Sequence, residues 1–149
     1  MPPGPNAMTL TLPIEAKTRI LIIEDDTFLA GMYVTKLGME KFATDVASDG
    51  KSGLDKAKRW SPDLILLDIL LPKMNGFDVL RALKASAQMR DIPVILLTNL
   101  GQKSDVLKGL AAGAADYLIK AHFMPSEVVD KIKEVLRQPR RPVISRPEP

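Results

Sequence analysis

The stretch LILLDILLP, residues 64–72, places one carboxylate, Asp68, inside an almost wholly aliphatic run. Residues 64–67 have the continuous apolar character of a strand that is covered on both faces of a parallel sheet. A carboxylate buried beside them costs several kcal/mol unless another group pairs with it. No basic residue lies next to Asp68, so its partner has to come from a distant segment. We therefore interpret Asp68 as the end of a buried strand and as a functional residue.

Four other short apolar runs have the same character, and segments with helical patterns lie between them. The runs are residues 19–23, 42–47, 94–97 and 116–119, and the helical segments are 25–38, 49–60, 75–86, 103–113 and 125–136. Gly38 is expected to end the first helix, and Pro125 to lie in the first turn of the last. Five alternating strand and helix units predict an α/β protein with a parallel sheet, right-handed crossovers and helices on both faces.

Polar side chains follow several of these strands. In an open parallel sheet the functional site lies at the carboxyl ends of the strands. Each polar residue alone could be a helix cap or a solvated loop residue, but together they indicate one site. No histidine or cysteine joins them, and an acidic cluster of oxygen ligands favours a hard cation such as Mg²⁺ over zinc. The residues are Glu24, Asp25 and Asp26 after the first strand, Asp68 after the third, Thr98 after the fourth and Lys120 after the fifth.

The composition fits one globular domain and excludes several kinds of site. The chain has 149 residues, of which 46% are hydrophobic, and its lack of cysteine excludes disulfides, thiolate metal sites and cysteine nucleophiles. No signal peptide and no apolar run of membrane-spanning length is present, so a soluble cytoplasmic protein without membrane insertion is expected.

The basic residues in excess lie at the end of the chain. Residues 1–136 hold 17 Lys or Arg and 17 Asp or Glu, so the net charge of +3 comes entirely from the segment RQPRRPVISRPEP, residues 137–149. We interpret this segment as a solvated tail and not as a nucleic-acid contact, because charge runs are usually solvated and the rest of the chain is neutral.

In their order and spacing, the site residues resemble the receiver domain of two-component response regulators. The matching segments are ILIIEDD (20–26), PDLILLDILLPKMNG (62–76), PVILLTNLG (93–101) and GAADYLIKA (113–121). The resemblance implies a flavodoxin-like, doubly wound (βα)5 parallel sheet with strand order 2-1-3-4-5. We expect a receiver domain at residues 18–138, a flexible extension at 1–17, and a basic, proline-rich, disordered tail at 139–149.

The resemblance also implies a role for each site residue. Asp68 would accept a phosphoryl group from a sensor histidine kinase or a phosphotransfer protein. Lys120 would pair with the phosphoryl oxygens, and Thr98 would donate its hydroxyl to one of them. The protein would not be an enzyme, since it would catalyse only its own phosphorylation and slow dephosphorylation. The ligands of Mg²⁺ would be Glu24 through a water, Asp25, Asp68 and the backbone carbonyl of Leu70.

The same resemblance implies how the signal leaves the site. A phosphoryl group on Asp68 would draw Thr98 inward, and Tyr117 would rotate into the vacated space. The surface made by the fourth helix (103–113), the fifth strand (116–119) and the fifth helix (125–136) would then change. A downstream target protein or a second copy would bind there, and no DNA-binding domain is expected in this chain.

The sequence departs from the family pattern next to the site. Ala121 stands where the family has a proline, so we expect either a strained cis Lys120–Ala121 bond or a rearranged loop. Leu70 and Leu100 occupy two positions that tune hydrolysis of the acyl phosphate in the family. Because neither side chain can orient a water, we expect a long-lived phosphoryl state. Asn99, next to Thr98, is expected to narrow the access of the phosphoryl donor to Asp68. His122 is interpreted as a loop residue without a phosphorelay role.

Two other function classes fit the sequence less well than a phosphoaccepting receiver. A phosphorylation-independent binding module with the same fold would need neither an acceptor nor a metal, yet every one of these positions is filled. A hydrolase that forms an aspartyl phosphate would need a second acid two residues after the nucleophile, and Leu70 stands there. No glycine-rich nucleotide loop of either common kind is present.

Overall fold

A computed structural model describes residues 17–99, 103–120 and 124–138 and contains a five-stranded parallel sheet. The strand order is β2-β1-β3-β4-β5, which confirms the predicted fold class and topology. Strands β3 and β4 each extend one residue further than expected, and β2 begins one residue later. The strands are β1 (Arg19–Ile23), β2 (Ala43–Ala47), β3 (Leu64–Asp68), β4 (Val94–Thr98) and β5 (Asp116–Ile119).

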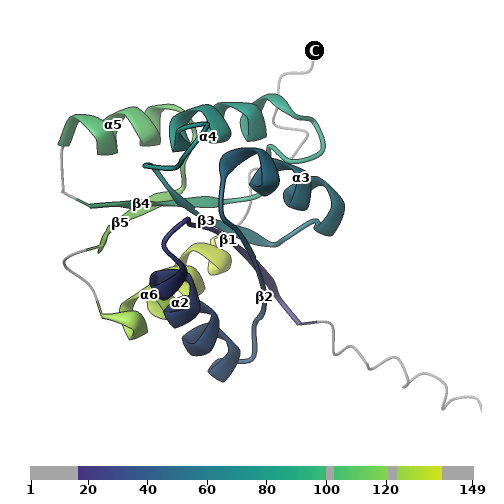
Figure 1. Cartoon of the computed structure of the whole chain (residues 1–149), viewed down its shortest axis with the longest axis vertical. Helices are drawn as coiled ribbons and strands as arrows, with labels where there is room; N and C mark the ends of the chain where they lie inside the picture. Colours follow the sequence, from purple (N-terminus) through teal and green to yellow (C-terminus); the bar gives the residue numbers. More distant parts are fainter. Residues whose placement is uncertain (1–16, 100–102, 121–123, 139–149) are drawn as a thin grey trace, which may run out of the picture.

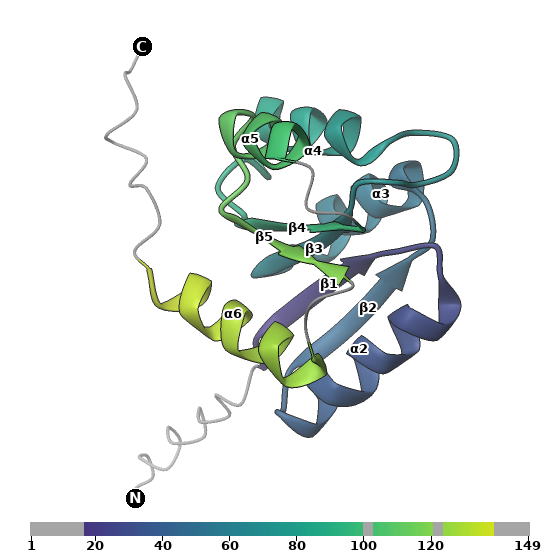
Figure 2. The same cartoon turned by 90° about the vertical axis from the view of Figure 1, so that its left-hand side faces the viewer.

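Helices cover both faces of the sheet, as Figures 1 and 2 show. Helices α2 and α6 lie on one face, and α3, α4 and α5 lie on the other. Successive strand residues therefore point to opposite sides: Leu66 packs in the core with α2 and α6, and Leu67 packs in the core on the other face. The helices are α2 (Thr27–Met39), α3 (Gly50–Trp60), α4 (Gly76–Ala85), α5 (Lys103–Ala111) and α6 (Pro125–Arg137).

The end of α2 corrects the prediction for Gly38. The helix continues through Gly38 to Met39, and the left-handed residue is Lys41, with φ of 71°. The Lys41 N–H donates to the Gly38 carbonyl and the Phe42 N–H to the Leu37 carbonyl, each at 3.0 Å. These two bonds form a Schellman motif that satisfies the last carbonyls of the helix. Phe42 thus belongs to the helix end, which is why β2 begins at Ala43.

Other helix ends agree with the sequence signals more closely. Asp49 caps α3, since its Oδ1 accepts a hydrogen bond of 2.8 Å from the Ser52 N–H. Pro125 is the first residue of α6, as predicted. Helix α5 ends at Ala111, two residues before Gly113, whose φ is 110°.

None of the helices within the described ranges combines the length and the apolar character that a membrane span requires. The expected extension at 1–17 and tail at 139–149 lie outside the described residues, except for Lys17.

Candidate functional site

The carboxyl ends of the strands bring three distant residues together at one rim of the sheet. Glu24 follows β1, Asp68 ends β3, and Lys120 follows β5; the two acids are only 1% and 3% exposed. The Lys120 Nζ lies 2.9 Å from Glu24 Oε1 and 2.9 Å from Asp68 Oδ2. Lys120 is therefore the distant cation that a carboxylate at the end of this buried strand requires.

The loop after β3 holds Asp68 from the other side. Asp68 Oδ1 accepts a hydrogen bond of 3.1 Å from the Leu70 N–H, and the Gly76 N–H donates to the Ile69 carbonyl at 2.7 Å. The loop thus folds back, so that the first residue of α4 lies against the Asp68 backbone. A Cβ at position 76 would lie 2.4 Å from the Asp68 carbonyl oxygen, which leaves room only for glycine. The spacing between Asp68 and Gly76 in the sequence motif therefore has a steric cause.

Glu24 carries the clearest electrostatic signature of the site. Burial raises the pKa of Glu24 from 4.5 to about 7, although Lys120 and the Asp26 N–H act in the opposite direction. Its Oε2 accepts a hydrogen bond of 3.1 Å from the Asp26 N–H. Its Oε1 is fully buried, and the Lys120 ammonium lies 2.9 Å from it.

Lys120 stays charged in this setting. Burial alone would lower the pKa of Lys120, but the hydrogen bonds and charges of Glu24 and Asp68 outweigh burial and raise it above its usual value. The site therefore keeps a permanent ammonium between two buried carboxyl groups.

The acidic residues at this rim fit a divalent cation. Ligand oxygens of Glu24, Asp25 and Asp68 lie within 4.8 Å of one another, and Asp25 is exposed where the other two are buried. Among the described residues, three carboxyl groups gather around one ammonium, and the buried Glu24 Oε1 has only the Lys120 Nζ beside it, at 2.9 Å. Oxygen ligands of this kind suit Mg²⁺. The Leu70 backbone belongs to the same rim through its bond to Asp68, while its side chain is 63% exposed.

Thr98 and Tyr117 lie on the neighbouring strands. Thr98 is the buried last residue of β4, one position beyond Leu97, which is the register partner of Asp68. Tyr117 is half-buried in β5 and packs against the core on the α3, α4 and α5 side. The structure places both residues beside the rim, and their action as a switch stays a prediction.

Several predictions fall on residues outside the described ranges. These are the conformation of the Lys120–Ala121 bond, the effect of Leu100 and the loop position of His122. Asn99 is described and is exposed next to Thr98.

Two residues near the site have local structural roles, of which the cap at Asp26 agrees with the predicted helix start. Asp26 is the N-cap of α2, because its Oδ1 accepts hydrogen bonds from the N–H groups of Phe28 and Leu29 at 3.0 and 3.1 Å. An aspartate directly before the first helical residue is the usual signal for such a cap. Lys73 has a left-handed φ of 70° in the loop after Asp68 and lies 3.9 Å from Asp49. No pattern in the sequence marks that conformation.

Comparison with known sequences shows one family. Residues 20–133 match the family model described as "Response regulator receiver domain". The DNA-binding response regulator MtrA of Mycobacterium tuberculosis is 41% identical over 122 residues, which are 82% of this chain and 52% of the relative. The DNA-binding dual master transcriptional regulator RpaA of Synechocystis is 40% identical over 123 residues, or 83% of this chain and 51% of the relative. The chain thus spans about half the length of these relatives.

Solved structures agree with the sequence comparison. A putative response regulator from Chloroflexus aurantiacus superposes with a TM-score of 0.77 at 30% identity, covering 82% of this chain and 99% of that one. The receiver domain of the sensor histidine kinase PA1611 from Pseudomonas aeruginosa superposes with a TM-score of 0.75 at 28% identity, covering 83% and 100%. That crystal structure has a magnesium ion coordinated in its active-site cleft.

Proposed function

The chain belongs to the receiver domains of two-component response regulators, and from this premise we propose that Asp68 accepts a phosphoryl group from a histidine kinase or a phosphotransfer protein. The observation that supports this role best is the burial of Asp68 at the end of β3 with Lys120 Nζ 2.9 Å from its Oδ2. In the reaction, a carboxylate oxygen of Asp68 forms a bond to phosphorus while the bond from phosphorus to the donor histidine nitrogen breaks. The imidazole leaves with the electron pair and takes up a proton.

The surrounding residues position the incoming group and balance its charge. The Lys120 ammonium, held by Glu24 and Asp68, would contact the phosphoryl oxygens, and the Thr98 hydroxyl would donate a hydrogen bond to one of them. Such transfers depend on positioning and charge neutralisation more than on covalent help from the protein. A Mg²⁺ ion held by Glu24, Asp25, Asp68 and the Leu70 carbonyl would supply further positive charge to the phosphoryl oxygens.

The output of the reaction would be a change in protein contacts. We propose that the phosphorylated state alters the face formed by α5, β5 and α6, with Thr98 and Tyr117 as the connecting residues. A downstream target protein or a second copy of the chain would bind this face. The relatives MtrA and RpaA are named as DNA-binding regulators, and they are about twice as long as this chain.

Treatment with acetyl phosphate and Mg²⁺ followed by mass spectrometry tests the acceptor role. The wild-type chain should gain the mass of one phosphoryl group, and peptide mapping should place it on Asp68. The variant Asp68→Asn should gain none, because an amide cannot form the acyl phosphate. Asp130→Asn serves as the control, since Asp130 is an exposed carboxylate on α6, and it should be labelled like the wild type.

The phosphate mimic beryllofluoride separates the proposal from its alternative. With Mg²⁺ present, it should bind the wild type and fail to bind Asp68→Asn. A wild type that takes up neither the phosphoryl group nor beryllofluoride would instead be a phosphorylation-independent binding module.

A further inference from the structure

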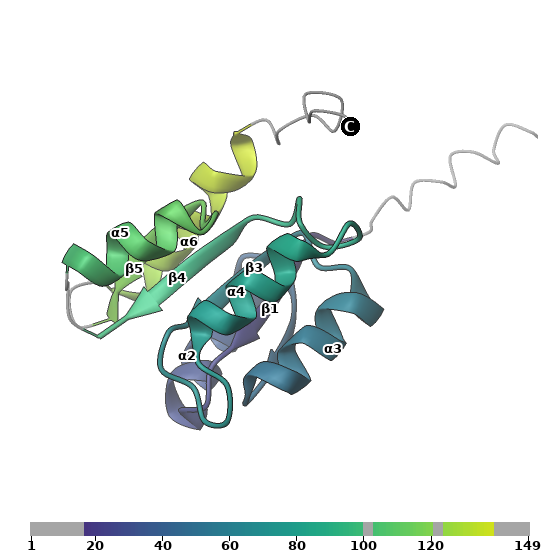
Figure 3. The ribbon, with the colours of Figure 1, turned by 90° about the horizontal axis from the view of Figure 1, so that it is seen from above.

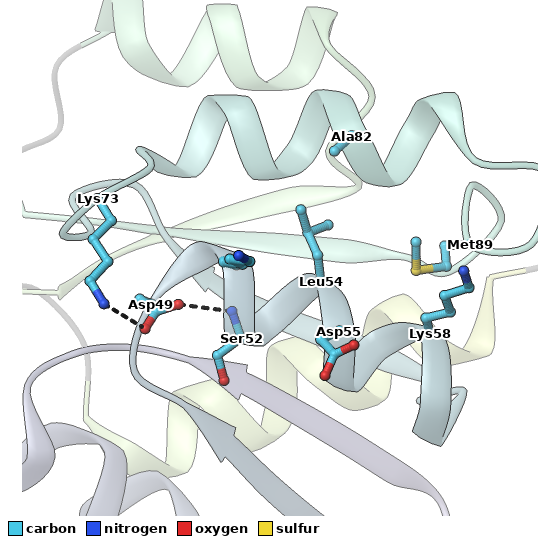
Figure 4. A pocket seen from close by; sticks show the side chains of 9 residues that line it. Asp49, Ser52, Leu54, Asp55, Lys58, Lys73, Ala82 and Met89 are labelled. Atoms are coloured by element: carbon cyan, nitrogen blue, oxygen red, sulfur yellow. Dashed lines mark hydrogen bonds and ion pairs between the residues drawn. The ribbon is translucent and has the colours of Figure 1, made fainter.

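A groove of about 610 Å³ runs between α3 and α4, and Lys73 from the loop after β3 lines one part of it. The two helices lie side by side in Figure 3, and Figure 4 shows the side chains that line the groove. Leu54 from α3, Ala82 from α4 and Met89 from the turn after α4 supply its apolar surface. An apolar groove open to solvent on a charged surface is a feature of interaction sites.

The cations around the groove are largely unneutralised. Lys51 and Lys58 come from α3, and Lys73 comes from the loop after β3. The side chains of Lys51 and Lys58 make no hydrogen bond or ion pair with any other described residue. Lys73 has only a long ion pair, with its Nζ 3.9 Å from Asp49 Oδ2. Lysine ammonium groups without acidic partners leave positive charge for a ligand.

The two carboxylates in the groove are already engaged. Asp49 caps α3 through the Ser52 N–H at 2.8 Å, and Figure 4 shows this bond together with the contact to Lys73. Asp55 Oδ2 accepts hydrogen bonds from Arg59 Nε and Nη2, at 3.2 and 3.0 Å. Each carboxylate thus already has a hydrogen-bonded neighbour, and the three lysines outnumber the two carboxylates among the lining residues.

The groove is preformed. The side-chain amide of Gln88 donates a hydrogen bond of 3.2 Å to the Lys58 carbonyl, which ties the end of α3 to the turn after α4. Met89 lines the groove with the small part of its surface that is exposed, and the rest of its side chain packs in the core. A ligand would meet a surface that is already ordered, which lowers the entropic cost of binding.

We propose that this groove is a docking site for an acidic, amphipathic segment of a partner protein. The apolar side chains of the segment would contact Leu54, Ala82 and Met89, and its Asp or Glu residues would pair with Lys51 and Lys58. These two lysines are seven residues apart, about 10 Å along the helix axis, so a partner helix of about three turns would span both. Binding of an amphipathic helix in a groove is a known mode of peptide recognition.

The same observations disfavour a nucleic acid. Phosphate backbones are bound by grooves with many cations, and bases stack on aromatic or guanidinium groups. This groove has three lysines, two carboxylates and no aromatic side chain among its lining residues. Its apolar surface would stay unused by a phosphate chain. The proposal does not depend on the phosphoacceptor role of Asp68.

Selection from a random peptide library displayed on phage tests the proposal with the full chain as bait. The enriched peptides should be rich in Asp and Glu and should carry apolar residues at helical spacing. A fluorescent synthetic copy of the most enriched peptide is then titrated, and amide NMR shifts should change mainly in α3 and α4.

Reversing the charge of the groove lysines, and of two lysines elsewhere as a control, tests whether the groove binds the peptide. The double variant Lys51→Glu/Lys58→Glu should weaken peptide binding by about tenfold or more, since two attractive contacts become repulsive. The control is Lys103→Glu/Lys36→Glu, which changes the net charge equally and also replaces one lysine in the first turn and one in the last turn of a helix. It should bind within about twofold of the wild type. Lys51, Lys58 and Lys103 are exposed and Lys36 is half-buried, so both double variants are expected to fold.

Three results would overturn the proposal. The first is that no acidic, amphipathic peptide is enriched, or that the enriched peptide binds both double variants equally. The second is that a scrambled peptide of the same composition binds as tightly, because charge alone would then explain the contact. The third is that a short DNA duplex binds the same lysines more tightly than the peptide.

Discussion

Strand β3 contains two regions that differ in kind within five residues. Leu64 to Leu67 are fully buried aliphatic side chains, whereas Asp68 is a buried carboxylate whose charge needs Lys120 as a partner. The leucines and isoleucine stabilise the fold by removing apolar surface from water. The carboxylate loses hydration, and its ion pair offsets that loss at best in part. The interior of the strand therefore contributes stability, while the carboxylate at its end costs stability that its ion pair offsets only in part.

The largest expected effect comes from the strand interior. Leu66→Ala should lower the free energy of unfolding by about 2–5 kcal/mol, because a cavity forms between the sheet and the helices on the α2 and α6 face. The folded fraction should still be labelled by acetyl phosphate, since the rim is unchanged. Urea unfolding measures the first effect and mass spectrometry the second. Asp68→Asn should lower the free energy of unfolding by less than about 2 kcal/mol, because Lys120 keeps its ion pair with Glu24. A loss equal to or larger than that of Leu66→Ala would contradict the different roles of the two residues.

A smaller effect is expected where the loop contacts the carboxyl end of β3. Gly76→Ala should destabilise by about 1–3 kcal/mol and slow phosphorylation, because the new Cβ meets the Asp68 backbone. Gly31→Ala is the matched control: a Cβ there meets nothing within 4 Å in the middle of α2, so it should stabilise by about 0.5–1 kcal/mol. Urea unfolding and the initial rate of labelling are measured for both. Equal effects of the two substitutions would argue against a steric role for Gly76.

The protonation of Glu24 makes the free energy of unfolding depend on pH, which tests how much the buried carboxylate destabilises the fold. Burial raises the pKa of Glu24 from 4.5 to about 7, so the folded chain binds this proton more tightly than the unfolded chain does. The stability that the proton contributes is therefore fully present below pH 4.5 and is lost as the pH rises through 7. Glu24→Gln, which cannot ionise, should therefore gain stability relative to the wild type over this range, on the order of 1–3 kcal/mol. Unfolding in urea without metal, at several pH values from 4 to 8, measures the difference between the two proteins.

A stability difference between wild type and Glu24→Gln that does not vary with pH would contradict this assignment. In wild type, Mg²⁺ should bind more weakly below pH 7 than above it, since the cation has to displace the proton of Glu24. Titration calorimetry at pH 6 and pH 8 measures this effect.

The smallest effect on stability is expected at Leu70. Its exposed side chain contributes little to the core, so Leu70→Asn should change the free energy of unfolding by less than about 0.5 kcal/mol. The lifetime of the phosphoryl group on Asp68, which is predicted to be long in the wild type, should nevertheless shorten several-fold, because an amide beside Asp68 can orient a water for hydrolysis. The decay is followed by mass spectrometry after removal of acetyl phosphate. Leu107→Asn, an exposed leucine on α5, should leave the lifetime unchanged, and a wild-type half-life of seconds would contradict the prediction.

Much of the fold could be predicted because it depends on local patterns. The bounds of β1 and β5 agree with the predicted runs, and Pro125 begins α6 as expected. The end of α2 could not be predicted in the same way. A glycine usually takes the left-handed position, and Gly38 looked like that residue; the helix continues because Lys41 adopts the conformation and two backbone bonds satisfy the last carbonyls.

The residues of the site could be predicted from the sequence, but their burial and contacts could not. The carboxyl ends of parallel strands share one edge, so the convergence of Glu24, Asp25, Asp68 and Lys120 followed from their positions at the ends of the predicted strands. The adjacent acids Glu24 and Asp25 look alike in the sequence, yet one is buried and the other exposed. The Glu24 carboxylate is buried because it lies against Lys120, a residue far along the chain.

The amino-acid pattern was enough to predict the alternation of strands and helices, the parallel sheet and the residues at its carboxyl edge, because apolar periodicity is local; the strand order came from the family resemblance. The folded chain adds what no local pattern contains: Lys120 Nζ lies between two buried carboxyl groups, Gly76 lies against the Asp68 backbone, and a groove lined by three lysines lies between α3 and α4. The physical reason is distance along the chain. Asp68 and Lys120 are 52 residues apart, and burial, pKa and contact arise only when the folded chain brings such residues together.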